Sequence, residues 1–166
     1  MYSSPDPSLP ELNPEPHQQK TINVATSRRA IEILLSDYHG FRCPTRSVRQ
    51  ELLVGFAMRG FALTGAAYDI VQINGDVDLG DRNNISSNLD AITLCEIKST
   101  NRVAMKEDLK GYFFNVTAAE LLVAQTLGER FKFAFVNVLT RSLQMLSLPE
   151  VMAKSRALYP AFHIRF

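Results

Sequence analysis

The sequence is poor in cysteine, has no long apolar run and carries almost no net charge. Its two cysteines, Cys43 and Cys95, are too few for a disulfide framework or for a zinc site built from two Cys-x-x-Cys pairs. No apolar stretch approaches the roughly 18 residues that cross a bilayer, and the N-terminus lacks the basic start and apolar stretch of a secretion signal. We therefore expect a cytoplasmic protein with reduced thiols and no catalytic cysteine.

Several common catalytic motifs are also missing. The chain has no Walker A loop, no G-x-S-x-G and no G-x-G-x-x-G, so nothing supports nucleotide hydrolysis, serine hydrolysis or dinucleotide binding. Its three histidines, His17, His39 and His163, are far apart and have no ligand spacing. We assign no metal-binding or catalytic role to these histidines.

Length and charge limit the architecture more than the function. A chain of 166 residues in which 46% are hydrophobic suits one domain with a real core. The net charge of +1 hides an acidic middle, residues 61–100, between basic segments at 26–60 and 101–166. Ordinary solvated surfaces explain this distribution as well as a metal site between phosphate-binding surfaces does.

Hydrophobic periodicity predicts an α/β protein. Residues 1–20 are rich in Pro, Ser, Glu and Gln and are expected to form a flexible tail, followed by a single domain at 21–166. The order α-α-β-β-β-α-β-β-α-β predicts a mixed central β-sheet with helices on its faces. The expected elements are helices at 26–36 and 47–59, strands at 61–64, 68–73 and 89–99, a helix from 117, strands at 131–139 and 143–148, a helix from 147 and a strand at 162–166.

One segment contains candidate catalytic residues. In Leu94–Thr100, Glu96 and Lys98 stand two residues apart and therefore share a strand face. A solvent-facing ion pair would give the same pattern. Because the preceding strand is strongly apolar, however, charges at its end are costly unless they are paired or bind something. A divalent metal would satisfy Glu96, and Lys98 would neutralise charge on a phosphate.

A hydrolytic metal site needs a second acidic ligand near Glu96. Asp90 shares its face but lies about 20 Å away at roughly 3.3 Å per residue. An antiparallel pairing that sets Ile73 opposite Ile92 also sets Asp69 opposite Glu96. Asp69 is therefore the expected ligand.

Asp78 is the alternative ligand, because a tighter hairpin from Asp76 to Gly80 would bring Asp78 nearer to the site. The surrounding run also resembles the start of a calcium loop but lacks the bidentate Glu at the proper offset. Asp76 and Asp81 are therefore expected to be solvated loop residues.

With these residues identified, the chain resembles the PD-(D/E)xK, restriction-endonuclease-like nuclease superfamily. Asp69 followed by Glu96-Ile97-Lys98 in an apolar hairpin resembles its motif, and Glu51–Phe61 is similar to its first core helix. The resemblance covers about residues 47–139, the αβββαβ core. The sequence departs from the pattern in having Tyr68 instead of Pro before the Asp and in a long insertion within the hairpin.

The resemblance implies a metal-dependent DNA endonuclease. It implies that Asp69, Glu96 and the Ile97 carbonyl bind Mg²⁺ or Mn²⁺, and that Glu51 reaches the metal's water or a second ion. It implies that Lys98 orients or activates the attacking water. For Glu51, a charge on the rim of an amphipathic helix is an equally good reading.

Other expectations concern partners. Arg102, Lys106 and Lys110 are candidate contacts to DNA phosphates, with solvated loop charges as the alternative, and Gln125 is a weaker candidate at the metal centre.

A domain of this size is expected to dimerise or to act with a partner subunit in restriction or phage defence. The competing hypothesis is a non-catalytic DNA-binding or scaffold module that keeps the nuclease fold, and a toxin or RNA-directed nuclease would use the same site.

Overall fold

The computed structural model describes residues 16–103, 106 and 108–159. None of the helices in that part of the chain combines the length and the apolar character needed to cross a membrane. The helices are α1 (Pro16–Asp37), α2 (Arg46–Ala57), α3 (Arg82–Ser87), α4 (Ala118–Leu127) and α5 (Leu148–Lys154), with short 3₁₀ turns at Leu89–Ala91 and Gly128–Arg130. The strands are β1 (Phe41–Arg42), β2 (Ile70–Ile73), β3 (Ile92–Thr100), β4 (Phe131–Asn137) and β5 (Ser142–Leu146).

The strands form one mixed sheet in the order β1-β2-β3-β4-β5. Strand β2 is antiparallel to both β1 and β3, β3 and β4 are parallel, and β5 is antiparallel to β4. The parallel pair requires a crossover connection, which contains α4. The predicted α/β class with a mixed central sheet is confirmed. The expected αβββαβ core is not, because among the described residues only two strands, β2 and β3, lie between α2 and α4.

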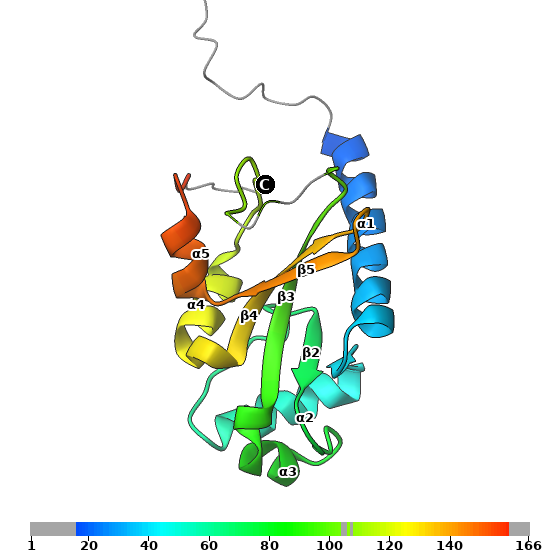
Figure 1. Ribbon diagram of the computed structural model, residues 1–166. Coiled ribbons are helices and arrows are strands. Elements are labelled where there is room, and N and C mark those ends of the chain that lie inside the picture. The colour runs from blue at the N-terminus through cyan, green and yellow to red at the C-terminus, as the bar shows by residue number, and fades with distance from the viewer. Residues whose placement is uncertain (1–15, 104–105, 107, 160–166) are drawn as a thin grey trace, which may run out of the picture.

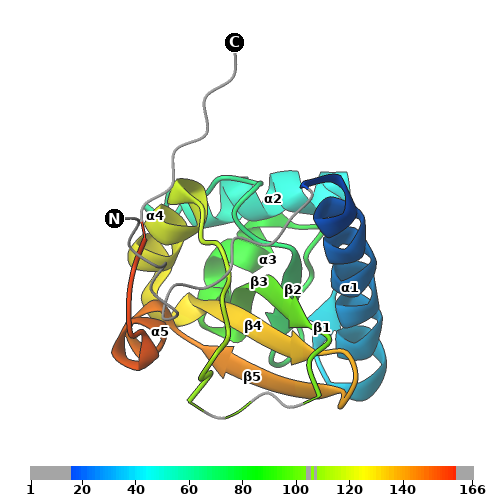
Figure 2. The same cartoon turned by 90° about the horizontal axis from the view of Figure 1, so that it is seen from above.

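Helices cover both faces of the sheet. Figures 1 and 2 show α1 on one side and α4 and α5 on the other. The α1 side chains Ala30, Ile33 and Leu34 join a buried cluster with Cys95 and Ile97. The opposite face packs against α2, α3, α4 and α5 in a larger core. Alternate residues of β3 therefore enter different cores, which is why this strand is apolar on both faces.

The β2–β3 pairing has the register that the sequence predicted. Ile73 lies opposite Ile92, and the ladder continues to Ile70 opposite Cys95. One step further along this ladder brings Asp69, the residue before β2, beside Glu96.

Two glycines permit close contacts around β2 and α2. At Gly40, whose φ is +82°, an added Cβ would lie 2.4 Å from the Ile73 carbonyl oxygen, and the Gly40 carbonyl accepts a hydrogen bond from the Ile73 N–H at 2.9 Å. At Gly55 an added Cβ would lie 2.5 Å from Cγ2 of Ile85, so α2 and α3 pack too closely for a side chain there.

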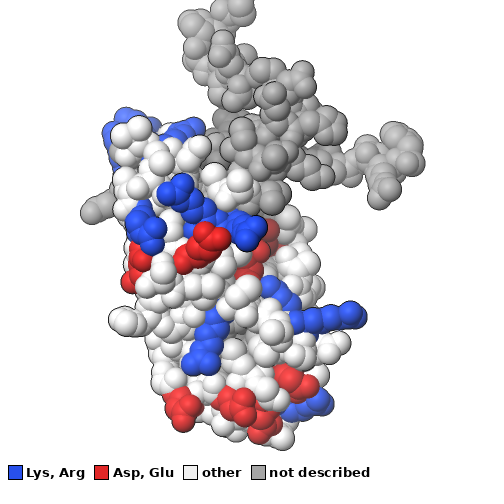
Figure 3. Space-filling view, turned by 90° about the vertical axis from the view of Figure 1, so that its right-hand side faces the viewer, with Lys and Arg blue, Asp and Glu red and all other residues white. Residues whose placement is uncertain are grey.

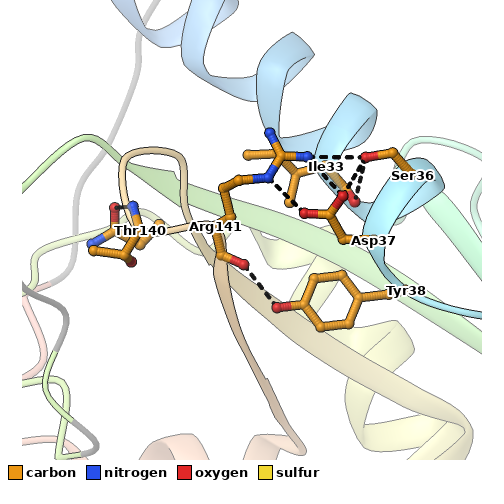
Figure 4. A network of polar contacts seen from close by, with 7 residues as sticks. Ile33, Ser36, Asp37, Tyr38, Thr140 and Arg141 are labelled. Atoms are coloured by element: carbon orange, nitrogen blue, oxygen red, sulfur yellow. Dashed lines mark hydrogen bonds and ion pairs between the residues drawn. The ribbon is translucent and has the colours of Figure 1, made fainter.

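An ionic contact fastens the end of α1 to the turn between β4 and β5 (Figure 4). The guanidinium of Arg141 donates to both carboxylate oxygens of Asp37, at 2.6 and 2.7 Å, and to the Ser36 hydroxyl. The Tyr38 hydroxyl donates to the Arg141 carbonyl at 2.8 Å. Arg141 has a φ of +55°, in the left-handed region, so these contacts hold a residue in a disfavoured backbone conformation. Hydrogen bonding by Arg141 lowers the pKa of Asp37 to about 2.

Three expectations about elements need correction. The segment 61–64 is not a strand, because the Phe61 N–H bonds to the Phe56 carbonyl at the end of α2 and its ring packs edge-on against Phe56. The polar segment after β2 contains α3, whose first turn is capped by Asp81. Helix α1 begins at Pro16, so residues 16–20 of the expected tail are helical. The predicted strand at 162–166 and residues 1–15 lie outside the described residues.

Candidate active site

The ammonium of Lys98 lies between two carboxylates. Strand β3 places Glu96 and Lys98 on one sheet face, and Lys98 Nζ donates to Glu96 Oε1 at 2.9 Å. The same nitrogen donates to Glu120 Oε2 of α4 at 2.8 Å. The side chains of Glu96, Lys98 and Glu120 are only 12%, 10% and 7% exposed, so this is a largely buried group of charges.

Glu120 occupies this position because of how α4 begins. It belongs to a reciprocal capping box with Thr117, at the helix start that the sequence predicted. The spacing of Thr117 and Glu120 is typical of a helix start and gives no indication of a role at the site. A further signal was present: Glu120 shares helical spacing with Val123, Ala124 and Leu127, the buried residues of the helix. A carboxylate among the buried residues of a helix needs a hydrogen-bonding or ionic partner.

Asp69 is fixed beside Glu96 by hydrogen bonds to β3. Its carboxylate Oδ2 accepts the Ile97 N–H at 3.0 Å, and its own N–H donates to the Cys95 carbonyl at 2.9 Å. Asp69, Glu96 and Lys98 are thus brought together at the end of the β2–β3 pair, as the register implied.

Burial and neighbouring charges act strongly on Glu96. Burial raises the pKa of Glu96 from 4.5 to about 8, Lys98 opposes this effect, and the negative charges of Asp69 and Glu120 reinforce it. Two carboxylates, those of Glu96 and Glu120, contact the Lys98 ammonium, and Asp69 adds a third negative charge beside Glu96. A cation bound beside Glu96 would reduce the repulsion among these carboxylates.

Arg49 of α2 holds the backbone that leads into β2. Its guanidinium donates to the carbonyls of Tyr68 and Asp69, each at 2.9 Å, and to that of Gly65 at 3.1 Å. It also stacks over the Tyr68 ring, 4.7 Å from the centroid. Sequence reasoning missed Arg49, because its partners are backbone carbonyls that leave no pattern in the sequence.

The donor set suits a hard divalent cation with an incomplete protein shell. Across residues 16–103, 106 and 108–159, no group of three or more His, Cys, Asp or Glu side chains is arranged to hold a metal ion. Mg²⁺ is commonly held by one or two carboxylates and several waters. Asp69 and Glu96 fit that requirement. The Ile97 carbonyl points to the same side of β3 as the Ile97 N–H, which bonds to Asp69.

The structure gives Glu51 and Asp78 other contacts. Both carboxylate oxygens of Glu51 accept hydrogen bonds from Arg82 of α3, at 2.7 and 2.8 Å. Asp78 is exposed, and its Oδ1 accepts the Gly80 N–H at 2.8 Å in the turn before α3. The carboxylate next to Glu96 is therefore that of Asp69.

The candidate phosphate contacts all lie on the surface. Arg102, Lys106 and Lys110 are exposed, and the Arg102 guanidinium donates to the Gly111 carbonyl. Gln125 is also exposed, off the buried stripe of α4. Figure 3 shows the side of the molecule that carries α1, where acidic groups lie among the basic ones and several more acidic groups gather at the lower end. That side offers no continuous basic surface.

Comparisons of the chain with models of protein families, with curated proteins and with solved structures found no match. The assignment of a function therefore depends on the geometry of the site.

Proposed function

We propose that the protein is a metal-dependent DNA endonuclease of the PD-(D/E)xK superfamily. The observation that carries this proposal is the position of Asp69, Glu96 and Lys98 together at one end of the β2–β3 pair, where Asp69 bonds to the Ile97 N–H. An acidic pair can hold a metal ion, and a neighbouring lysine can face the phosphate, which are two roles that suit metal-assisted phosphodiester hydrolysis. Burial of these charges, which is costly in a purely structural role, adds support.

In this proposal, Asp69, Glu96 and the Ile97 carbonyl would hold Mg²⁺ or Mn²⁺. A bound ion of this kind lowers the pKa of water and stabilises negative charge on phosphate oxygens. The reaction is hydrolysis: a water oxygen forms a bond to phosphorus, the bond to one ester oxygen breaks, and that leaving oxygen receives a proton.

The remaining residues have assisting roles in this proposal. The ammonium of Lys98 lies 2.9 Å from Glu96 Oε1, beside the proposed metal ligand. From there Lys98 would orient the attacking water or offset charge on the scissile phosphate. Arg102, Lys106 and Lys110 contact phosphates along the DNA. Glu51 would reach the metal's water or a second ion only after leaving Arg82.

The proposed setting is the cytoplasm, in a restriction or phage-defence system. The described residues contain one candidate site, whereas a double-strand break needs two cuts. We therefore propose that the enzyme acts as a homodimer or with a partner subunit.

The test is cleavage of supercoiled and linear plasmid DNA with Mg²⁺ or Mn²⁺. The wild type is compared with Glu96→Ala and with Glu129→Ala, a control that removes an exposed glutamate paired with Lys132. We expect metal-dependent cutting by the wild type and by Glu129→Ala, and none by Glu96→Ala or in EDTA. Equal cutting by Glu96→Ala would show that the activity comes from elsewhere.

One observation favours a second candidate function, a non-catalytic DNA-binding or scaffold module. Lys98 is already paired with both Glu96 and Glu120, and Glu51 with Arg82, so most of these charges are balanced within the chain. A module of this kind would bind DNA without cutting it. Its binding would also persist in Lys98→Ala.

A further inference from the structure

Glu120 joins the start of α4 to the candidate site through one oxygen atom. Its Oε2 accepts hydrogen bonds from Lys98 Nζ at 2.8 Å and from the Thr117 backbone N–H at 3.2 Å. We propose that Glu120 is a positioning residue that fixes the ammonium of Lys98, so that Lys98 keeps its place when Glu96 is engaged by a metal ion. The effect on catalysis rests on the proposed nuclease function, whereas the effect on Lys98 itself does not.

Lys98 needs a second carboxylate for an electrostatic reason. A lysine side chain has four rotatable bonds and a compact charge, so one contact leaves its position loosely defined. A metal ion held by Glu96 would compete with Lys98 for the same carboxylate. Because the side chain of Lys98 is only 10% exposed, leaving its charge without a partner would be costly. Glu120 provides that partner.

The position of Glu120 is itself fixed by the helix. The Glu120 N–H donates to the Thr117 hydroxyl at 3.2 Å while the Thr117 N–H donates to the Glu120 carboxylate, which closes the capping box. Val123 and Ala124 bury the next turn of α4 in the core. The location of the ammonium is therefore determined by the packing of α4 on the sheet.

The chain contains a matched control for this arrangement. At the start of α5, Ser147 and Glu150 form a second capping box, and Lys132 lies 3.7 Å from Glu150 Oε2. The Glu150 side chain is 53% exposed, so its lysine contact is a surface one. Losing the Glu150 charge tests the effect of a weakened helix cap without a change at Lys98. Thr117→Val weakens the cap of α4 itself but keeps the Glu120 carboxylate.

The test compares Glu120→Ala, Glu120→Gln, Thr117→Val and Glu150→Gln with the wild type in the full chain. The first measurement is native-state labelling of lysine amines, read at Lys98 by mass spectrometry. The second is the kcat and KM of plasmid cleavage with Mg²⁺. Circular dichroism checks that each variant is folded.

We expect labelling of Lys98 to rise several-fold in Glu120→Ala, to rise less in Glu120→Gln, which keeps an acceptor oxygen, and to stay at the wild-type level in the two cap variants. A displaced catalytic group can lower the rate about 10²-fold, so we expect kcat of Glu120→Ala to fall by about that factor while KM changes little. Glu120→Gln should recover part of kcat.

Unchanged labelling of Lys98 in both Glu120 variants would overturn the proposal. An equal rise in Glu150→Gln would overturn it too, because a weakened cap at another helix would then be enough to change the labelling of Lys98. If Glu120→Ala does not fold, Glu120→Gln decides by the same criteria. If the wild type cuts no DNA but labelling follows the expected pattern, Glu120 positions Lys98 and the nuclease function is wrong.

Discussion

The backbone N–H of Ile97 donates a 3.0 Å hydrogen bond to the carboxylate of Asp69. This contact fastens the start of β2 to the strand that carries Glu96 and Lys98. It orients one oxygen of Asp69 toward the β3 backbone, and in the proposed function the other oxygen would bind the metal ion. The relative position of the two carboxylates is therefore a property of the sheet.

Removing the charge of Asp69 should abolish stabilisation by metal. A ligand that binds only the folded state stabilises it by about 2.7 kcal/mol at a concentration of 100 times its Kd. We expect Mg²⁺ to raise the free energy of unfolding of the wild type and to have little effect on Asp69→Asn, as measured by urea denaturation. Asp90→Asn, which changes an exposed aspartate, should respond like the wild type. Equal stabilisation of Asp69→Asn would exclude Asp69 as a ligand.

Replacing Arg49 should destabilise the fold and weaken the site together. Arg49→Met loses hydrogen bonds to three carbonyls and the stacking on Tyr68, and a hydrogen bond to a charged group contributes about 1.5–3 kcal/mol. We expect a loss of about 2–3 kcal/mol in urea denaturation, less than the sum of three such bonds because these bonds are exposed or only partly buried and water can replace the lost donor. We also expect a higher Mg²⁺ requirement for cleavage. Arg49→Lys should be intermediate, because lysine lacks the planar fork. Arg46→Met, at an exposed position of α2, is the control.

Lowering the pH should remove the contribution of the Asp37–Arg141 contact to the free energy of unfolding. Because the pKa of Asp37 is lowered from 3.8 to about 2 in the folded state, its stabilising effect is complete above pH 3.8 and lost as the pH falls toward 2. We expect wild type to be more stable than Asp37→Asn at neutral pH and the difference to vanish near pH 2. Urea denaturation across this range measures it. A difference that stays constant with pH would contradict the assigned ion pair.

The exposed cations after β3 should control DNA affinity through salt. Each lost phosphate contact lowers the slope of log K against log salt by about 1. We therefore expect Lys106→Ala with Lys110→Ala to reduce that slope by about 2 and to weaken binding to all sequences alike. Fluorescence anisotropy with a labelled duplex over a salt series is the measurement. Arg28→Ala, an exposed change on α1, should leave the slope as it is.

The position of Asp69 could be predicted because sheets obey a simple rule. Side chains alternate with a period of two, so one correct apolar pair, Ile73 with Ile92, fixes every other pair in the hairpin. The same reasoning identified Glu96 and Lys98 as neighbours on one face. The insertion that contains α3 does not alter the register of β2 and β3, so the site could be predicted without that helix.

The contacts of Arg49 and Glu120 could not be predicted in the same way. Arg49 binds backbone carbonyls 16–20 residues away, and any residue type can supply a carbonyl. Glu120 meets Lys98 only because the crossover brings the start of α4 against β3, a tertiary relationship that local spacing does not encode. The segment 61–64 was wrongly predicted as a strand for a related reason: Phe61 packs against Phe56 of α2, and the segment pairs with none of the described strands.

Asp37 and Arg141 are 104 positions apart in the chain, and this separation has a consequence for folding kinetics. Closing so long a loop is entropically unfavourable until the strands between them have assembled. We therefore expect the contact to be absent from the folding transition state. Interactions of that kind slow unfolding and leave the folding rate nearly unchanged. Arg141→Ala should thus shorten the lifetime of the native protein while it refolds at about the wild-type speed, as stopped-flow measurements would show.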